Sequence, residues 1–268
     1  MSLHFQSIRS SSKGNCLAVF TEKTRILVDV GLSSMKRTRA GLAEVFGNPS
    51  KVDAVIVSHT HSDHVSYYPL RVLADTGIPL NIHHRCANQL EEKHFTGPGG
   101  IGGLGRLKVR TFDDNPFEIG NLHIQPFEVS HNPYYPTFGF AIRHGNTKLV
   151  IATDLNRFDG IVDHFLDADF IFIEANHDLD LLDQYYNPNS RYHLPNPSTA
   201  QLLDRVCTES STPPKSVMLG HISPQRNTAS IAIKEVSAHF RRNKKEMDFD
   251  LTAAPLNAAA DPIAVMAP

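Results

Sequence analysis

Short apolar runs recur along the chain, and most of them end in a polar residue or a glycine. Runs of about four to eight apolar residues bounded by turn-forming residues predict buried strands. Strands are predicted over residues 25–30, 52–58, 79–82, 107–112, 122–129, 138–143, 148–152, 169–174 and 216–219. Gly145 and Asn146 lie between two of these strands and tolerate the positive φ of a tight turn, which predicts a β-hairpin.

Three stretches have the apolar spacing of helices: residues 63–74, 198–207 and 229–241. Because these helices are interleaved with strands, we expect an α/β fold, an αββα sandwich of two mixed sheets between helical layers. No linker separates two cores, so residues 1–252 are predicted to form a single domain. The Gly-rich stretch 96–103 is predicted to be a mobile loop within it, and the Ala- and Pro-rich residues 253–268 a flexible C-terminal tail.

Composition restricts the class of protein only in part. The net charge is −2 and the isoelectric point is about 6.7, so charge alone does not indicate a protein that binds polyanions. Three cysteines without a CxxC pair make a disulfide framework improbable. The first residues show no basic region followed by an apolar stretch, and no transmembrane run follows. We therefore expect a cytoplasmic protein without a membrane partner.

Four residues of metal-ligand type fall within six positions directly after the predicted strand that ends at Ser58. They are His59, His61, Asp63 and His64. Neutral imidazole and carboxylate are good ligands for zinc and similar divalent ions. His59 and His61 alternate in an extended segment, so their side chains should point the same way. This string predicts a metal site.

Three more candidates each follow a predicted strand: His131, Asp154 and His221. A single histidine at the end of a strand is more often structural than a ligand. Together with the first string, however, these residues complete a set of seven.

The pattern HxHxDH, followed by His, Asp and His, resembles that of the metallo-β-lactamase superfamily over nearly the whole chain. The resemblance implies two divalent ions, zinc or manganese or iron. It assigns His59, His61 and His131 to the first ion, Asp63, His64 and His221 to the second, and Asp154 to both. Asp29, within the predicted strand 25–30, matches the early structural Asp of the family and would support the ligands.

Three further stretches are similar to segments of the YycJ-like (WalJ-like) branch of the superfamily. They are SSKGNC at residues 11–16, IEANHD at 173–178 and HLPN at 193–196, where Tyr192 and Pro195 depart from the pattern of the branch. This resemblance implies a nuclease, an exonuclease acting on DNA, and hence a phosphodiester substrate.

Two divalent ions can share a hydroxide that attacks a phosphodiester at neutral pH. Asp63 could orient that nucleophile, while His177 and His193 could position or protonate the leaving oxygen. Arg106, Lys108 and Arg110 alternate, so a strand would place all three on one face as a stripe for phosphates. Asn176 and Asn196 are further candidates for substrate contacts.

Two other functions remain open. A glyoxalase II-like thioesterase, or another small-ester hydrolase, would have the same seven ligands. A non-catalytic metal-binding module is the second alternative, although such a protein would be expected to have lost ligands. The sequence does not separate DNA from RNA, exo- from endo-cleavage, or one metal from another, and it does not indicate an oligomeric state.

Overall fold

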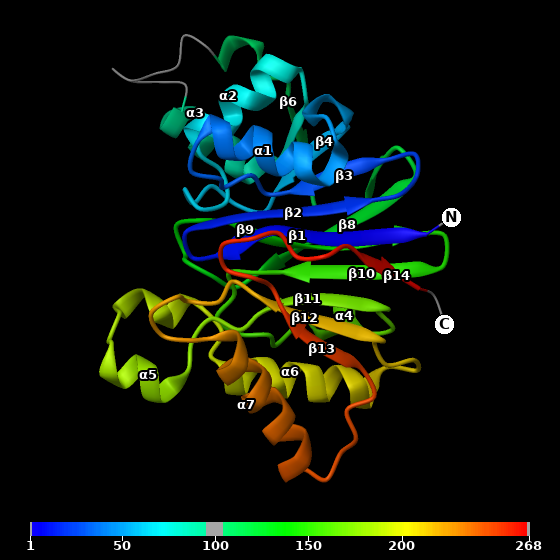
Figure 1. The fold of residues 1–268 in the computed structure, drawn as a ribbon, viewed down its shortest axis with the longest axis vertical. Helices are drawn as coiled ribbons and strands as arrows, with labels where there is room; N and C mark the ends of the chain where they lie inside the picture. The colour runs from blue at the N-terminus through cyan, green and yellow to red at the C-terminus, as the bar shows by residue number, and fades with distance from the viewer. Residues whose placement is uncertain (1, 95–103, 267–268) are drawn as a thin grey trace.

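Two seven-stranded sheets pack face to face in the structure, a computed structural model that describes residues 2–94 and 104–266 (Figure 1). The first sheet has the order β14 (Ile263–Val265), β1 (Leu3–Ser11), β2 (Gly14–Phe20), β3 (Arg25–Val28), β4 (Ala54–Val57), β5 (Leu80–His83), β6 (Val109–Phe112). The second has the order β13 (Asp250–Ala253), β12 (Ser216–Gly220), β11 (Phe170–Glu174), β10 (Thr147–Ala152), β9 (Thr137–His144), β8 (Leu122–Val129), β7 (Phe117–Ile119).

Helices cover the outer side of each sheet (Figure 1). The first sheet is covered by α1 (Met35–Phe46), α2 (Tyr67–Thr76) and α3 (His84–His94), and the second by α4 (Val162–Phe165), α6 (Asn196–Glu209) and α7 (Ala229–Arg242). The short helix α5 (Leu179–Gln184) buries no residue and lies to one side of the second sheet (Figure 1). Three 3-10 helices complete the described elements: η1 (Pro49–Lys51), η2 (Leu104–Arg106) and η3 (Pro188–Tyr192). This is the predicted αββα sandwich.

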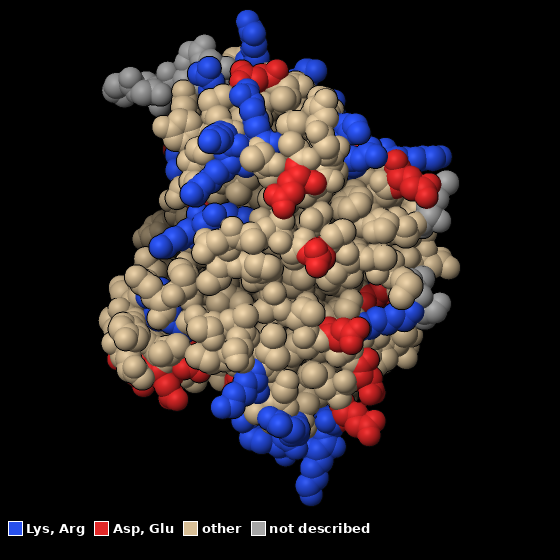
Figure 2. All heavy atoms as spheres, viewed as in Figure 1, with Lys and Arg blue, Asp and Glu red and all other residues tan. Residues whose placement is uncertain are grey.

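Lys and Arg side chains gather at the two ends of the molecule, and the face between them is mostly uncharged with scattered acidic residues (Figure 2). At one end they lie over α1, which carries Lys36, Arg37 and Arg39, and at the other over the end of α7. The surface is hollowed at the left edge of Figure 2, between the two halves. No helix among the described residues is long and apolar enough to span a membrane.

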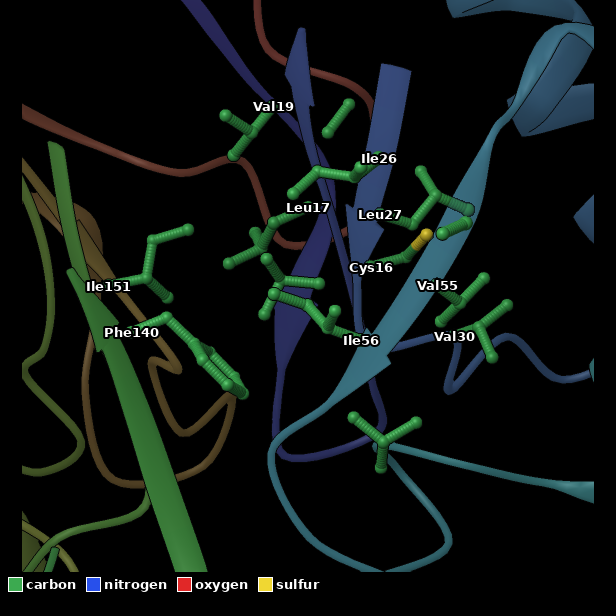
Figure 3. Close-up of a cluster of buried hydrophobic side chains, with 14 of the residues drawn as sticks. Cys16, Leu17, Val19, Ile26, Leu27, Val30, Val55, Ile56, Phe140 and Ile151 are labelled. Atoms are coloured by element: carbon green, nitrogen blue, oxygen red, sulfur yellow. The ribbon is translucent and has the colours of Figure 1, made fainter. Parts of the chain in front are cut away.

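The apolar core lies between the two sheets and draws on both of them. Leu17, Ile26 and Ile56 of the first sheet face Phe140 and Ile151 of the second (Figure 3). The ring of Phe5 on β1 lies 4.7 Å from that of Phe170 and 5.2 Å from that of Phe172, both on β11. Burial on this scale holds the strands in register and thereby fixes where each strand ends.

Most predicted elements are confirmed. The strand 122–129 matches β8 at both ends, and β9 and β10 form the hairpin with Gly145 at φ 58°. The helices predicted over 198–207 and 229–241 are α6 and α7. The predicted Gly-rich loop at 96–103 lies outside the described residues.

The helix predicted from residue 63 begins later, at Tyr67. Residues 62–65 instead form a turn, in which the amides of His64 and Val65 both donate to the carbonyl of His61. Val65 also pairs with Val30 in an isolated bridge. The polar string is thus held as a turn between β4 and α2, with its side chains directed to the site.

The prediction of a flexible tail over 253–268 is wrong for the described part of it. Asp250–Ala253 form β13 beside β12, and Ile263–Val265 form β14 antiparallel to β1. Val265 is buried although its neighbour Met266 is exposed. The segment is stabilised by backbone pairing with the sheet, which its Ala- and Pro-rich composition did not indicate.

Val265→Ala should lower the free energy of unfolding by about 2 kcal/mol, because a buried branched side chain is truncated on β14. Met266→Ala is the matched control and should change it by less than about 0.5 kcal/mol. Chemical denaturation of both variants gives the comparison. Equal, negligible effects would mean that β14 does not pack on β1.

Candidate metal centre

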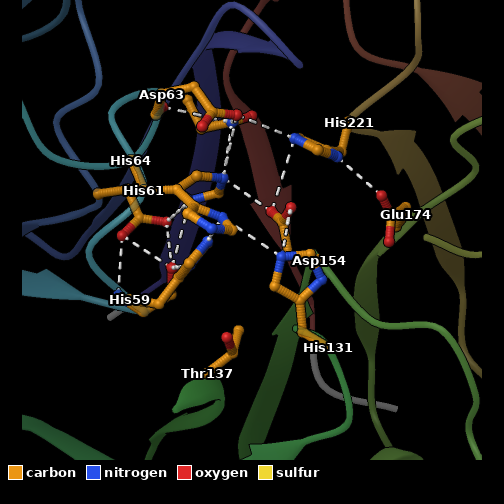
Figure 4. A network of polar contacts seen from close by, with 12 residues as sticks. His59, His61, Asp63, His64, His131, Thr137, Asp154, Glu174 and His221 are labelled. Atoms are coloured by element: carbon orange, nitrogen blue, oxygen red, sulfur yellow. Dashed lines mark hydrogen bonds and ion pairs between the residues drawn. The ribbon is translucent and has the colours of Figure 1, made fainter. Parts of the chain in front are cut away.

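The seven predicted ligands converge at one edge of the two sheets, each from the end of a strand (Figure 4). The turn after β4 carries four of them. The others follow β8, β10 and β12, and the seven are His59, His61, Asp63, His64, His131, Asp154 and His221. Because the strands are fixed by the core, the ligands are fixed with them.

One group of ligand atoms comes from three histidines and a carboxylate. His61 Nδ1 lies 2.8 Å from His59 Nε2 and 3.3 Å from His131 Nε2. Asp154 Oδ1 is 3.7 Å from His131 Nε2. One ligand atom from each of these four residues lies within 4.8 Å of every other, which is close enough for a single ion.

A second group lies on the other side of Asp154. His221 Nε2 is 3.4 Å and His64 Nε2 is 3.6 Å from Asp63 Oδ2. Asp154 Oδ2 lies 2.7 Å from His64 Nε2 and 3.5 Å from His221 Nε2. The two oxygens of Asp154 therefore face different ligand groups.

A divalent cation fits these residues. Asp154 is 1% exposed, and its Oδ2 makes no hydrogen bond of good geometry within the described chain, although it lies close to His64. A buried carboxylate oxygen without a donor is destabilising unless a cation compensates its charge. Imidazole and carboxylate donors suit zinc, manganese or iron.

The second ring nitrogens of four ligand histidines are held by the protein. Nδ1 of His64 is 2.7 Å from Asp29 Oδ2, and Nδ1 of His131 donates to the carbonyl of Tyr192 at 2.8 Å. Nδ1 of His59 lies 3.0 Å from Ser58 Oγ, which itself donates to Asp29. These contacts orient each ring with Nε2 toward the centre. Asp29 therefore lies where the sequence predicted a supporting carboxylate.

Glu174 holds Nδ1 of the fourth histidine, His221, and was not predicted as a site residue. Its Oε1 accepts from Nδ1 of both His221 and His193 at 2.7 Å, and its Oε2 accepts from the amides of Leu155 and Leu194. The side chain is fully buried at the end of β11. Glu174 ends an apolar strand, and the predicted ligands also lie at strand ends. This position was the signal that could have identified it.

Asn15 is a second residue that sequence reasoning missed. Its amide nitrogen Nδ2 lies 3.0 Å from His64 Nε2 and 3.4 Å from Asp63 Oδ2. Its backbone amide donates to the carbonyl of Asp63, and its carbonyl accepts from Gly31. The SSKGNC segment thus fixes the ligand turn to the β1–β2 turn.

Three site residues have a left-handed backbone: Asp29 at φ 62°, Asp154 at 57° and His221 at 49°. Residues with a Cβ seldom adopt this conformation, and it persists where the surrounding structure imposes it. Each lies within two residues of the end of a strand, so the change in φ ends the extended backbone beside the site.

Burial and charge divide the histidines into two classes. Burial, and then the neighbouring His131, lowers the pKa of His61 to about 4. At His221 burial opposes the charged form, but Asp154, Asp63 and Glu174 more than offset it and raise the pKa to about 10. The pKa of His64 is likewise raised, against burial, by Asp154 and Asp29.

The two predicted catalytic histidines differ in position. His193 lines a cavity of about 320 Å³ together with Asp63 and Asn176. Burial alone would lower the pKa of His193, but Glu174 raises it above its usual value. His177 is buried outside the residues that line the cavity, with Nδ1 3.3 Å from Asn176 Oδ1. A catalytic role for His177 does not fit this position.

Several residues that were predicted to contact the substrate do not lie at the cavity. Asn196 is fully buried and hydrogen-bonds with Asn227, so its role is structural. Arg106, Lys108 and Arg110 do not line the cavity. Arg106 lies in η2 and β6 begins only at Val109, so the three side chains do not form the predicted stripe along a strand.

The fold and the site together define a metal-dependent hydrolase of the metallo-β-lactamase type. A family profile described as "Beta-lactamase superfamily domain" matches residues 24–222. The chain belongs to the metallo-β-lactamase superfamily. It is 30% identical to a protein named "Exodeoxyribonuclease WalJ" from Streptococcus pneumoniae, covering 85% of this chain and 84% of that one. It is 29% identical to "Exodeoxyribonuclease YycJ" from Bacillus anthracis, covering 88% and 89%.

Solved structures share the fold at much lower sequence identity. The metallo-β-lactamase fold protein YhfI from Bacillus subtilis superposes with a TM-score of 0.73 at 18% identity, covering 97% of this chain and 99% of that one. Unliganded yeast PDE1 gives a TM-score of 0.73 at 12% identity, covering 99% and 100%. These similarities confirm the predicted architecture.

Glu174→Gln should lower metal affinity by about 10- to 100-fold. A glutamine side chain has one acceptor oxygen, so it cannot accept both from the rings of His193 and His221 and from the backbone amides that Oε2 of Glu174 binds. Titration calorimetry with zinc measures the change. Glu128→Gln, which alters an exposed ion pair with Arg85, is the control and should bind zinc normally. Equal zinc affinity in both variants would show that Glu174 does not support metal binding.

Metal binding should also release protons unequally. The pKa of His221 is raised to about 10 and that of His64 is also raised, so an ion bound by these two residues must displace protons from their rings. His61 and His131 have lowered pKa values and are already neutral. The affinity of one ion should therefore rise with pH toward about 10, and that of the other should stay nearly constant above pH 7. Calorimetry in buffers of different ionisation enthalpy tests this, and equal release by both ions would contradict it.

Proposed function

We propose that this protein is an exonuclease that hydrolyses phosphodiester bonds of DNA with two divalent metal ions. The observation that carries the proposal is the position of Asp154, whose Oδ1 lies near His131 and whose Oδ2 lies near His64 and His221. The names of the two relatives support DNA as the substrate.

The first group, with Asp154, would hold one ion, and Asp63, His64 and His221, again with Asp154, would hold the other. When bound, such ions activate water at neutral pH and neutralise the charge on a phosphoryl oxygen. Two cations suit a phosphodiester better than a neutral ester, because the phosphodiester brings its own negative charge to the centre.

Asp63 and His193 are the side chains of this chain that act beside the ions. Asp63 is 23% exposed and lines the cavity, so its carboxylate can orient the attacking water. Burial would raise the pKa of Asp63, but His64 and His221 outweigh burial and lower this pKa to about 2. The carboxylate is therefore charged at every working pH.

In this proposal His193 acts as the acid. Nδ1 donates to Glu174, which holds the ring and raises its pKa, and this leaves Nε2 to give a proton to the departing oxygen. The same carboxylate holds His221. Glu174 thus couples the ligand of one ion to the proposed acid.

A parallel assay tests the substrate class. Single- and double-stranded DNA, RNA, bis-p-nitrophenyl phosphate and a glutathione thioester are each incubated with manganese or zinc. The proposal predicts cleavage of DNA from an end and of the small phosphodiester. Thioester hydrolysis without cleavage of any nucleic acid would overturn it in favour of a glyoxalase II-like enzyme.

Asp63→Asn should reduce turnover of every phosphodiester by about 10²- to 10⁴-fold. The substitution keeps the volume of the side chain and removes its charge. Circular dichroism should show an intact fold, and elemental analysis gives the metal content. Unchanged turnover with metal retained would leave Asp63 without the proposed role.

A further inference from the structure

The cavity beside the metal ligands has a second wall that the proposed chemistry does not use. Besides the ligands and His193, its lining consists of uncharged polar residues and one arginine, namely Ser12, Asn132, Asn176, Asn187, Asn189, Ser190, Tyr192 and Arg226. No carboxylate lies in this wall. At about 320 Å³ the cavity is at the small end of the range for ligand sites, so it suits the end of a strand.

Arg226 supplies the one permanent positive charge in the lining. Its backbone is held at both ends, because its amide donates to Ser223 Oγ and its carbonyl accepts from Asp178. Its Nη1 donates to Gln225 Oε1, while its buried Nε makes no hydrogen bond within the described chain. No carboxylate of the described residues forms an ion pair with it. A partly buried guanidinium with unused donors is well suited to bind an anion.

Ser190 offers another unused donor in the same wall. The residue is 3% exposed, and its Oγ has no hydrogen-bond partner among the described residues. Its backbone is fixed within η3 by contacts with Asn187 and His193. Buried hydroxyl groups are normally hydrogen-bonded, so an unpaired one beside a polar cavity indicates a missing acceptor.

We propose that Arg226, with Ser190, binds a non-scissile phosphate of the strand being cut. The scissile phosphate belongs at the metal ligands, and none of these ligands hydrogen-bonds to Arg226 in the described structure. Arg226 is therefore free to take a different phosphate of the same strand. This phosphate is either the terminal monoester or the neighbouring diester. The inference rests on the proposed function, since it requires a polynucleotide substrate.

Arg226→Gln tests the subsite by comparing two substrates in the same enzyme. The ratio of oligonucleotide to bis-p-nitrophenyl phosphate turnover (kcat/KM) should fall about tenfold, mainly through a higher KM, because the small diester has no second phosphate. Arg226→Lys keeps the charge and should recover part of the loss. The slope of log(kcat/KM) against log salt should become shallower by about 0.7 for a single strand. Arg205→Gln, in an exposed pair on α6, is the control.

Oligonucleotides with and without a terminal phosphate, at either end, identify the source of the phosphate. A wild-type preference for one phosphorylated end that disappears in Arg226→Gln assigns the terminal monoester. An equal loss on all ends, with no wild-type preference, assigns the neighbouring diester. An unchanged substrate ratio and salt slope, or an equal loss on both substrates, would overturn the subsite. If the wild type cleaves no nucleic acid, the proposed function itself fails.

Discussion

The compensation of buried negative charge is the interaction on which the rest of this structure depends. Asp29, Asp154 and Glu174 lie at strand ends in the interior, each at most 2% exposed. Carboxylates in such a place are stable only when histidine protons or metal ions balance them. The histidine rings surround them for that reason, and the left-handed backbone at Asp29, Asp154 and His221 shows how far the chain departs from regular geometry to bring them together.

The same constraint explains features distant from the ligands. The turn that carries Asp63 approaches the segment after β3 so closely that a Cβ on Gly31 would lie 1.7 Å from the Asp63 carbonyl oxygen. The backbone amide of Asn15 donates to that same carbonyl. Glu174 holds a ligand, His221, and the proposed acid, His193, with one oxygen. One connected set of side chains therefore positions the predicted ligands and the proposed acid.

The sequence predicted the architecture and the seven ligands because both depend on local patterns: apolar strands, and polar residues directly after them. It did not indicate β1 and β2, which bury polar residues such as Ser7 and Ser10 and so lack alternation. It also missed α3, where only Cys86, Leu90 and His94 are buried in an otherwise polar stretch. Three features depend on contacts between distant segments: the position of Glu174, the pairing of β14 with β1, and the guanidinium of Arg226, which has no ion pair among the described residues. No local pattern reveals such contacts.

Under the proposed function, Asp154 would contact two metal ions, one in each ligand group. The most direct measurement is anomalous X-ray diffraction from crystals grown with manganese or zinc. We expect two anomalous peaks about 3.5–4 Å apart, with Asp154 Oδ1 on one ion and Oδ2 on the other. A single peak at full metal saturation, or two ions of which only one contacts Asp154, would contradict the account.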